Sequence, residues 1–492
     1  MSQPDLTQLM TQHRIILVRC NPLDREWIVS THLSDCQRWR LNVAILQGRG
    51  YANANDAIAS PFPLLLDAIR NVSTEGNFIF DNYLTFVATL APWERQLIYE
   101  QFADLYSLCQ HRYRLVLLQT DDTPLPIELA RFIYEYNWEL PTAAEITELF
   151  GEYHFEPSDR NLRLASGLAY QDLKLALQQS VESLEPELYL ETYRNARLSL
   201  MGVKYDPPPA FREIAGLDEL VLAIDKLKFR FSQRAIEIGL PYPKGWLLVG
   251  IPGTGKTYSA RAIASALGYP MLSLEIDKIK VGGLTAMARV LEIARVCAPC
   301  IFYMDEIEKL FTRDDKPLLS LLLTWLQDKT FPVFVIGTLN RIEDLPVEAT
   351  RAGRFDAVWE VDSPDAESRL NLFLLFLKRF DFRFKDDLVF DKYEWQGILD
   401  ETIEYVGAEI EQIVIDTISR VKECDPNGEV SARDLLEEAM QFNCMFERNS
   451  KQIVTIRNSI RELAKPSHSK KQSILAPRNI DPYRPAKVVS SN

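Results

Sequence analysis

Short apolar stretches alternate with amphipathic ones through the first part of the chain. The segments between the apolar stretches, such as Trp93–Cys109, carry apolar residues at the spacing of helices. The apolar stretches, which predict buried strands, are Arg14–Cys20, Val43–Gln47, Phe78–Phe80 and Arg114–Gln119. Such alternation is typical of a parallel sheet with crossover helices, and the residues that follow, 158–200, predict helices only.

Three successive prolines, Pro207, Pro208 and Pro209, mark the clearest boundary in the chain, because a helix cannot continue through them. A second alternation of strands and helices follows, and residues 365–446 then predict mostly helices. We therefore expect four parts. They are an N-terminal α/β domain over 1–205, a second α/β core over 206–363, a helical lid over 364–449, and a basic, partly disordered tail over 450–492.

The composition is that of a globular, acidic protein. Of the 492 residues, 47% are hydrophobic and 25% are charged, which excludes a mainly disordered or fibrous chain. The formal net charge is −14, so the chain as a whole does not attract nucleic acid or anionic membranes. The charge is uneven, since residues 451–492 contain nine bases and two acids, a net +7, which leaves −21 on the rest.

Neither end of the chain predicts targeting or membrane insertion. The longest apolar stretches, such as Leu372–Leu377, are far shorter than the ~20 residues of a transmembrane helix. The N-terminus has the acidic Asp5 and a short apolar run, Ile15–Val18, which fits neither a secretory signal nor a transit peptide. We therefore expect a soluble protein that works in the compartment where it is made.

A glycine-rich motif gives the most specific signal in the chain. Residues 250–257 have the G-x-x-x-x-G-K-T pattern of a phosphate-binding P-loop, between an apolar strand and a helical run. The predicted nucleotide-binding residues of this loop are Gly250, Ile251, Pro252, Gly253, Thr254, Gly255, Lys256 and Thr257. The glycines let backbone N–H groups face the phosphates, Lys256 reaches the β- and γ-phosphates, and the Thr257 hydroxyl ligates Mg²⁺.

Two later strands predict the rest of an ATP-hydrolysing site. One ends in Asp305, which we expect to hold Mg²⁺ through water, and in Glu306, which we expect to polarise the attacking water. The next strand ends in Asn340. Because ligands lie at the carboxyl ends of parallel strands, Asn340 is expected to help place that water, and capping of the next turn is the alternative. ATP and Mg²⁺ are therefore the expected cofactors.

Two arginines, Arg351 and Arg354, follow on a polar loop. Arginines on such a loop are ordinarily only solvated. After this series of strands, however, they predict catalytic residues that stabilise charge on a phosphate bound by a neighbouring subunit, an effect on the order of 10³–10⁵ in rate. Action between subunits requires a homo-oligomer, and a hexameric ring is the form that we expect.

In this order, these residues resemble the AAA ATPase family. The resemblance covers about 206–446, and it includes residues 407–410, which are similar to the family's sensor-2 segment with alanine in place of arginine. It implies an AAA+ P-loop NTPase fold with a C-terminal helical lid, in which Asn340 is sensor 1 and Arg351 and Arg354 are arginine fingers. Further residues that it places near the nucleotide are Ile214, Ala215, Tyr258, Gly407 and Ala408.

The whole chain also resembles a narrower group, the hypothetical AAA-domain proteins encoded in algal plastid genomes and in cyanobacteria. The features that carry this resemblance are the segments 298–308 and 324–329 and an N-terminal domain of this length. The resemblance implies a location in the plastid stroma or the cyanobacterial cytoplasm. It does not name a client.

One segment departs from the family pattern. Unfoldases of the family present an aromatic residue to a central pore, and the matching stretch here, Ile279–Gly283, has Lys280 at that position. A lysine on a loop without a special role is the simpler interpretation. Threading of a polypeptide through a pore is therefore in doubt.

The first domain faintly echoes the second. One of its strands ends in Asp81 as a later strand ends in Asp305, but its turn Asn21–Arg25 has neither a glycine nor a lysine. Such a turn cannot cradle phosphates. One interpretation is a degenerate P-loop-like fold that does not bind nucleotide, and an unrelated α/β domain is the alternative.

Three functions remain open from the sequence. The first is an ATPase that couples turnover in a ring to remodelling of a protein partner, and the second is a low-turnover, ATP-dependent switch or scaffold without substrate threading. The third is nucleic-acid binding by the basic tail. It is disfavoured because the bases are scattered and only Tyr483 could stack on a nucleobase. A solvated tail, or one that binds the acidic body of a neighbouring subunit, is the alternative.

Overall fold

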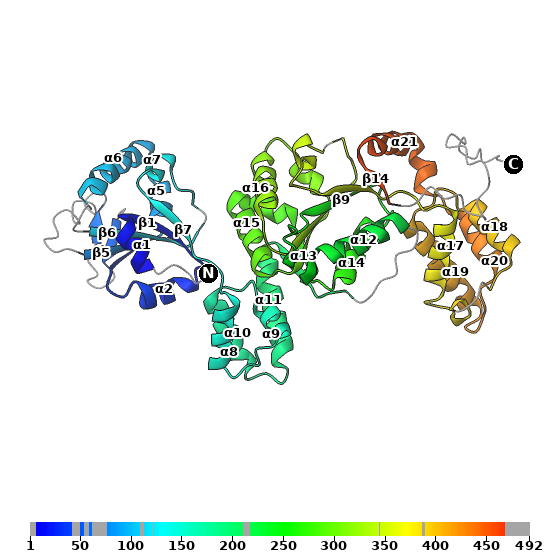
Figure 1. Ribbon diagram of the computed structural model, residues 1–492, viewed down its shortest axis with the longest axis horizontal. Coiled ribbons are helices and arrows are strands. Elements are labelled where there is room, and N and C mark those ends of the chain that lie inside the picture. The colour runs from blue at the N-terminus through cyan, green and yellow to red at the C-terminus, as the bar shows by residue number, and fades with distance from the viewer. Residues whose placement is uncertain are drawn as a thin grey trace. The chain divides into compact units, whose positions relative to one another are not determined.

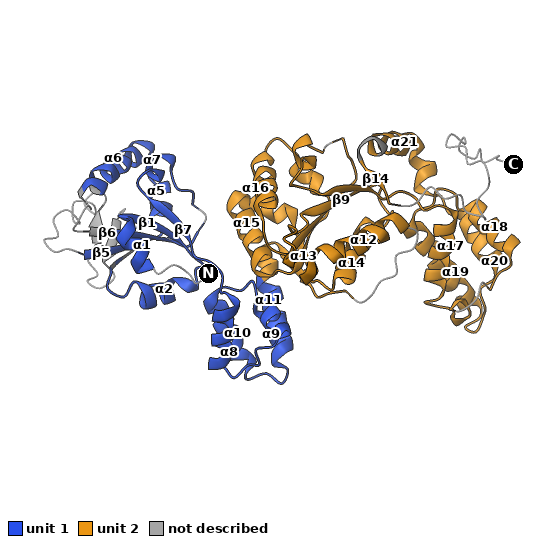
Figure 2. Cartoon of the chain, in the orientation of Figure 1, with its two compact units in different colours: residues 1–197 blue, residues 198–492 orange. Residues whose placement is uncertain are grey.

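The chain forms two compact units, residues 1–197 and 198–492, which we call unit 1 and unit 2 (Figure 1, Figure 2). The computed structural model describes residues 6–41, 50–53, 59–61, 76–108, 113–121, 123–209, 217–343, 345–385 and 389–467. The predicted strand Val43–Gln47, the predicted adenine contacts Ile214 and Ala215, and the tail beyond Ser467 lie outside the described residues.

Unit 1 begins with an α/β core around a seven-stranded sheet. The order across the sheet is β4 (Ala59–Pro61), β3 (Gly50–Asn53), β2 (Gln37–Leu41), β5 (Gly76–Asp81), β6 (Tyr113–Gln119), β1 (Ile15–Arg19) and β7 (Tyr134–Asn137). The five strands from β2 to β7 are parallel, whereas β3 and β4 pair antiparallel at one edge. The predicted parallel sheet is therefore present, although β2 and β7 were not anticipated from the sequence.

Helices cover both faces of this sheet, which explains why its central strands are continuously apolar. The helices are α1 (Leu6–Gln12), α2 (Asp24–His32), α5 (Tyr83–Ala88), α6 (Pro92–Leu108) and α7 (Ile127–Ala130). On β1, Ile15 and Leu17 pack into one buried apolar cluster with α5 and α6, while Ile16 and Val18 pack into a second with α1 and α2. This alternation follows from the two-residue period of a strand.

Four helices complete unit 1. They are α8 (Ala143–Glu152), α9 (Asp159–Ala165), α10 (Tyr170–Ser180) and α11 (Pro186–Leu200). They surround an apolar core of their own, which includes Leu149, Phe150, Leu173 and Leu177. The all-helical segment predicted for residues 158–200 corresponds to the last three of them.

Unit 2 contains a second seven-stranded sheet. Its order is β14 (Lys465–Pro466), β13 (Ala357–Glu360), β9 (Gly245–Val249), β12 (Val333–Leu339), β11 (Cys300–Met304), β10 (Met271–Leu274) and β8 (Val203–Asp206). Only β8 pairs antiparallel. Because β8 belongs to this sheet, the division between the compact units falls after Arg197, before the expected boundary at 205.

Helices also cover both faces of the second sheet. They are α12 (Asp218–Arg230), α13 (Gln233–Glu237), α14 (Lys256–Leu267), α15 (Ile276–Val296) and α16 (Lys316–Asp328), with short 3₁₀ turns η1 (Ile307–Leu310) and η2 (Val347–Thr350). The helical lid follows as α17 (Ala366–Leu377), η3 (Phe382–Phe384), α18 (Lys392–Glu401), α19 (Gly407–Cys424) and α20 (Ala432–Gln441). The lid has a separate apolar core, centred on Phe373, Trp395 and Ile413.

The chain then returns from the lid to the sheet. Helix α21 (Met445–Leu463) spans the expected boundary at 449, and β14 pairs with β13 at the sheet edge. Ile453 and Ile460 of α21 are buried. The first part of the basic tail is therefore packed against unit 2 and not solvated. In the described part of the chain, no helix combines the length and apolar character needed to span a membrane.

Candidate active site

The glycine-rich loop leaves the carboxyl end of the central strand β9. This strand is wholly buried and pairs in parallel with β12 and β13, so residues 250–255 emerge among the ends of three strands. Gly253 and Gly255 have φ values of 81° and 94°, in the region that favours glycine. At Gly250, a Cβ would lie 1.9 Å from the Val361 carbonyl oxygen. The shape of the loop therefore depends on all three glycines.

Lys256 is the first residue of α14, and only 9% of it is exposed. Its Nζ donates to the carbonyl oxygens of Gly250, at 2.8 Å, and Ile251, at 2.9 Å. Burial lowers the pKa of Lys256 to about 8, and three nearby carboxylates partly offset this effect. The ammonium group thus lies inside the loop and at a helix N-terminus, where an anionic phosphate would be stabilised.

Asp305 follows the end of β11 beside this loop. The Tyr303 hydroxyl lies 2.9 Å from Asp305 Oδ1 and 3.1 Å from Thr257 Oγ1, so it connects the two predicted Mg²⁺ ligands. Thr338 of β12 donates its hydroxyl to Asp305 Oδ1 and accepts the Glu306 N–H at 3.0 Å. Burial raises the pKa of Tyr303, which keeps this phenol a neutral donor. The carboxylate is therefore held in place from two strands.

Glu306 adopts a left-handed backbone conformation, with a φ of 51°, which is uncommon for a residue other than glycine. The Asn340 amide Nδ2 lies 3.5 Å from Glu306 Oε1, and the Asn340 backbone N–H donates to Glu308 Oε1 at 3.0 Å. Lys309 forms an ion pair with Glu306 at 3.0 Å. The two side chains predicted to act on water are therefore adjacent, and Glu308 fixes the backbone of one of them.

A cavity of about 520 Å³ opens beside these residues. Its lining includes Ile251 and Pro252 of the loop, Glu306, Asn340, and one face of α21. The predicted loop, acidic and amide side chains thus surround one space at the carboxyl ends of β9, β11 and β12. This is the edge of a parallel sheet at which ligands bind.

Comparison with known proteins assigns this architecture to a family. Residues 246–363 match the model of the ATPase family associated with various cellular activities (AAA). The uncharacterized AAA domain-containing protein ycf46 of Guillardia theta is 31% identical over 359 residues, which cover 66% of this chain and 69% of that protein. The chain belongs to the AAA family.

Two other relatives show how far the similarity reaches. The ycf46 protein of Trieres chinensis is 27% identical over 83% of this chain and 87% of its own length, so the similarity extends beyond unit 2 into unit 1. An ATP-dependent zinc metalloprotease FtsH from a Synechococcus strain is 35% identical, but over 33% of this chain and 28% of the protease. With the parallel sheet and its helical lid, AAA membership confirms the predicted P-loop NTPase fold class.

The predicted sensor-2 residues lie against the AAA loop. Gly407 is the first residue of the lid helix α19, and the Ala408 N–H donates to the Gly253 carbonyl oxygen at 3.3 Å. Tyr258 lies in the first turn of α14. The lid therefore contacts the core directly at the glycine loop.

The two arginines lie at the opposite end of the sheet. Arg351 and Arg354 precede β13, whose first residue, Ala357, pairs with Trp246 at the start of β9. The five residues of β9 extend over about 16 Å, so neither arginine is beside the loop of its own chain. The Arg351 side chain is exposed, and Arg354 donates to the Glu348 carbonyl oxygen at 2.7 Å.

Lys280, at the position expected for a pore aromatic, lies in α15 and not on a loop. Its ammonium group forms an ion pair with Asp315 at 2.7 Å. The helix breaks at Gly283, whose φ of 66° and ψ of −153° are not helical. The exposed side chains here are apolar, since Val281 is 92% and Leu284 51% exposed.

Sequence reasoning did not anticipate that α21 would line the site. Ile453 of α21 packs with Ile251 of the glycine loop and Val406 of the lid. Arg457, 9% exposed, donates to Asp362 at 2.8 Å and to Glu404 at 2.5 Å. Asp362 lies between β13 of the core and α17 of the lid, and Glu404 lies between the lid helices α18 and α19. The alternation of Ile453, Arg457 and Ile460 along one helical face was a signal in the sequence, but the sequence does not say what that face contacts.

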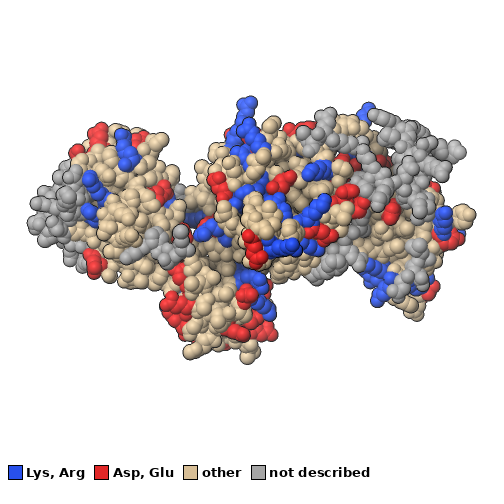
Figure 3. Space-filling view, viewed as in Figure 1, with Lys and Arg blue, Asp and Glu red and all other residues tan. Residues whose placement is uncertain are grey.

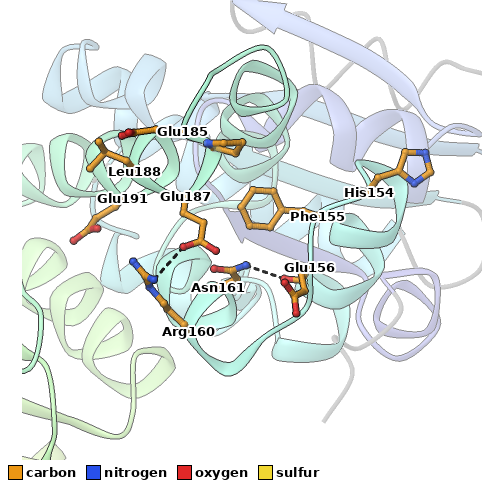
Figure 4. Close-up of a pocket in the computed structure, with 10 residues that line it drawn as sticks. His154, Phe155, Glu156, Arg160, Asn161, Glu185, Glu187, Leu188 and Glu191 are labelled. Carbon is orange, nitrogen blue, oxygen red and sulfur yellow. Dashed lines mark hydrogen bonds and ion pairs between the residues drawn. The ribbon is translucent and has the colours of Figure 1, made fainter.

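A second cavity, of about 550 Å³, lies in the helical part of unit 1 and is lined by His154, Phe155, Arg160, Asn161 and several glutamates (Figure 4). It has no glycine loop, and Arg160 is paired with Glu187 at 3.2 Å. The lining of this cavity therefore differs from the site in unit 2, where a buried lysine lies within a glycine loop. On the face drawn in Figure 3, Lys and Arg side chains gather over the middle of unit 2, and Asp and Glu side chains lie among them.

Proposed function

We propose that unit 2 binds and hydrolyses ATP with Mg²⁺, and that an oligomeric ring of the chain couples this turnover to remodelling of a protein partner. The observation that carries the proposal is the convergence of Lys256, Thr257, Asp305, Glu306 and Asn340 on one edge of the sheet. AAA membership supports the ATP-dependent activity in general.

The side chains present suit Mg-ATP. Gly255 leaves open space, since a Cβ placed there would meet no atom within 4 Å, and the backbone can therefore approach a phosphate. The buried Lys256 ammonium donates to the carbonyl oxygens of Gly250 and Ile251, which a phosphate oxygen would replace as a stronger, charged acceptor. Thr257 and Asp305 supply the hydroxyl and carboxylate oxygens that Mg²⁺ prefers.

Each residue has a distinct part in this mechanism. Bound Mg-ATP supplies the phosphoanhydride bond to be cleaved and a metal charge that offsets negative charge on the phosphates. Lys256 stabilises the charge that develops on the β- and γ-phosphate oxygens. Glu306 accepts a proton from the attacking water, and Asn340 holds that water and the Glu306 carboxylate in register.

The position of Arg351 and Arg354 supports action on a neighbouring subunit. A chain whose arginines lie about one strand length from its own loop needs a second copy to bring them to a γ-phosphate. A closed ring gives every site such a neighbour. We propose a hexamer, and nucleic acid is not part of the proposed assembly.

The test measures steady-state phosphate release and the oligomeric state of the full chain. Arg354→Ala is expected to bind ATP but to turn it over poorly, whereas Arg433→Ala, which removes an exposed lid arginine, should leave turnover unchanged. Glu306→Gln is expected to keep ATP bound and to stabilise the ring. Normal turnover of the Arg354→Ala chain would end the model of action between subunits.

A second candidate is a low-turnover switch or scaffold that does not thread a polypeptide. The observation that favours it is the ion pair of Lys280 with Asp315 of the same chain. This pair holds the side chain at the position expected for the pore aromatic, so that it does not take the place of that aromatic in a pore. Phosphate release well below about 1 s⁻¹, unaffected by candidate partners, would favour this candidate over remodelling. Capture of partners with the Glu306→Gln chain addresses the client directly.

We propose the plastid stroma or the cyanobacterial cytoplasm as the place where the chain works. The homology to ycf46 proteins supports this compartment. Fractionation of cells that express the full chain tests it, and recovery with membranes after a high-salt wash would contradict it.

A further inference from the structure

Unit 1 has the same strand order as unit 2. Leaving aside the two-residue edge strand β14, the parallel strands of unit 2 are β9, β10, β11, β12 and β13. Numbered along the chain, they lie side by side in the order 5-1-4-3-2. In unit 1 the strands β1, β2, β5, β6 and β7 lie in the same order, also all parallel. An antiparallel strand extends the sheet next to the second strand in both units, as β3 and as β8.

The ends of the strands correspond in detail. The first residue after strand 1 donates its N–H to the last residue of strand 4 in both units, from Cys20 to Gln119 and from Gly250 to Leu339. Strand 3 leads to the acidic residue Asp81 in unit 1. The residue that follows it, Asn82, has a φ of 50°, as Glu306 has a φ of 51° after Asp305. The backbone of a catalytic turn is thus present without its glutamate.

The segments before strand 5 share a four-residue pattern. Residues 125–128 read Leu-Pro-Ile-Glu and residues 345–348 read Leu-Pro-Val-Glu. A single helical turn follows in both units, α7 and η2, capped by a proline with a ψ of 138° or 139°. The turns end at Arg131 and Arg351. Unit 1 therefore has an arginine at the position of a predicted arginine finger.

The helices that follow strand 5 correspond as well. The third lid helix of unit 2, α19, has the buried acid Glu409 as its third residue, and the third such helix of unit 1, α10, has the buried Asp172 there. The second residue of each helix donates its N–H toward the turn after strand 1. Ala408 donates to the Gly253 carbonyl oxygen, and Gln171 donates to Asp24 Oδ1 at 2.7 Å.

Asp24 supplies an anion at the place of a phosphate. It is the first residue of α2, as Lys256 is of α14, and it is 3% exposed. Its carboxylate lies at the N-terminus of α2 and accepts a hydrogen bond from the N-terminus of α10. Two helix N-termini that converge on one buried negative charge provide the environment in which phosphates are bound.

Other side chains occupy the rest of this region. Tyr170, the counterpart of Gly407, stacks on Trp27 of α2 with ring centroids 4.1 Å apart and an angle of 12°. The Arg38 guanidinium lies 2.7 Å from Asp81 and 2.7 Å from Glu26, so it neutralises the carboxylate that corresponds to the metal-side Asp305. A cation and an anion of the chain thus take the positions of metal and phosphate.

We propose that unit 1 is a second core-and-lid module of the AAA design whose nucleotide site is filled by Asp24, Tyr170 and Arg38, and in which Asp24 latches lid to core. Its lid contact is then independent of nucleotide, whereas the contact of Ala408 with Gly253 in unit 2 responds to it. The inference concerns unit 1 alone and does not depend on hydrolysis by unit 2.

The first test is the stoichiometry of Mg-ADP binding to the full chain, measured by titration calorimetry. One site per wild-type chain and none in the Lys256→Ala chain are expected. Two sites per wild-type chain, or a site that survives in Lys256→Ala, would overturn the proposal. A chain that binds one nucleotide and never hydrolyses ATP would end the proposed function and leave this inference intact.

The second test is hydrogen exchange at the Gln171 amide. This N–H has no acceptor within its own helix, because it is the second residue of α10. Asp24→Ala should therefore raise its exchange about tenfold. Asp24→Asn keeps an acceptor, and Asp35→Ala removes an exposed acid elsewhere in unit 1, so neither should do so. Addition of Mg-ATP should alter exchange at Ala408 and not at Gln171. Unchanged exchange in Asp24→Ala, or a response of Gln171 to ATP, would contradict the latch.

Discussion

In unit 2 the first strand of the core ends in a glycine loop that leads to Lys256, whereas in unit 1 the corresponding strand ends in a shorter turn that leads to Asp24. One helix begins with a buried cation that needs an anion, and the other begins with the anion itself. The charge of Lys256 in unit 2 is only partly offset by nearby carboxylates, and burial lowers its pKa to about 8. A P-loop-type module can therefore be completed either by a ligand or by its own side chains.

The difference also concerns the link between core and lid. In unit 2 the two are joined through backbone groups at the loop and through α21, which spans both. In unit 1 they are joined by a carboxylate and by stacked aromatic rings. A ligand can enter the first kind of junction, and it would have to displace buried side chains from the second.

The largest contrast should come from Arg351 in unit 2 and Arg131 in unit 1, which occupy corresponding positions. Arg351→Ala is expected to lower ATP turnover by about 10³-fold or more, because it removes the charge stabilisation that we propose for the site of a neighbouring subunit. Arg131→Ala changes the same position of the Leu-Pro-x-Glu segment in unit 1 and should alter turnover less than twofold. Phosphate release assays on both chains, with nucleotide affinity as the control, decide this. Equal losses would break the comparison.

The next contrast comes from Glu306 in unit 2 and Asn82 in unit 1, which occupy the same position after strand 3. Glu306→Gln should reduce turnover by about 10²–10⁴-fold while ATP binding persists, because the change removes the proposed base and leaves the binding loop intact. Asn82→Asp keeps the left-handed turn and an acceptor for the Thr120 N–H, so turnover should remain normal. A substantial loss in the Asn82→Asp chain would mean that unit 1 takes part in the chemistry.

The third contrast concerns helix α21, which contacts both the core and the lid of unit 2. Arg457→Gln should destabilise unit 2 by about 3 kcal/mol, because it leaves the carboxylates of Asp362 and Glu404 without their buried partner. The KM for ATP should rise more than kcat falls, since the junction of core and lid loosens. Lys451→Gln, on an exposed face of the same helix, serves as the control in denaturation and kinetic measurements. A chain unaffected in both would exclude a positioning role for Arg457.

The smallest effect should appear in the pH dependence of unit 1. Burial raises the pKa of Asp24 to about 6, with the nearby Asp172 acting in the same direction and hydrogen bonds from Gln171 and Tyr170 acting against it. The folded state then holds a proton that the unfolded chain releases above about pH 4. This contribution to stability is complete below pH 4 and is lost as the pH rises through 6.

Thermal denaturation between pH 5 and pH 8 measures this contribution. The unfolding transition of unit 1 should lie higher at pH 5, by on the order of 1–2 kcal/mol in stability. Asp24→Asn removes the titrating group and should flatten this part of the profile. A profile of the same slope in wild type and Asp24→Asn would show that other groups dominate.

Residues of the candidate site could be predicted from the sequence where backbone geometry restricts the residue type. The positive φ values at Gly253 and Gly255 allow little besides glycine, and the carboxyl ends of buried strands are readable from apolar runs. Predictions for Lys256, Asp305, Glu306 and Asn340 therefore correspond to residues that the structure brings to one edge. Their roles remain predictions.

Contacts between distant segments were not accessible in the same way. Nothing local in Arg457 indicates Asp362 or Glu404 as its partners, because these lie 95 and 53 residues away in the chain. Tyr303 reads as one more apolar strand residue, yet its hydroxyl joins Thr257 to Asp305. The correspondence between the two units could be predicted only in part. The Leu-Pro-x-Glu pattern occurs at 125–128 and at 345–348, but the strand order is needed to interpret it.

The two-residue strand β14 determines where the chain can be shortened without uncovering the edge of the sheet. Lys465 and Pro466 lie along β13, the Ser467 N–H donates to the Glu360 carbonyl oxygen, and the Ser467 carbonyl oxygen accepts the Leu220 N–H. An open sheet edge is a template for pairing between molecules. A chain cut before Lys465 would uncover β13 and should self-associate through this edge, whereas one cut after Ser467 would keep the edge covered and should not pair through it.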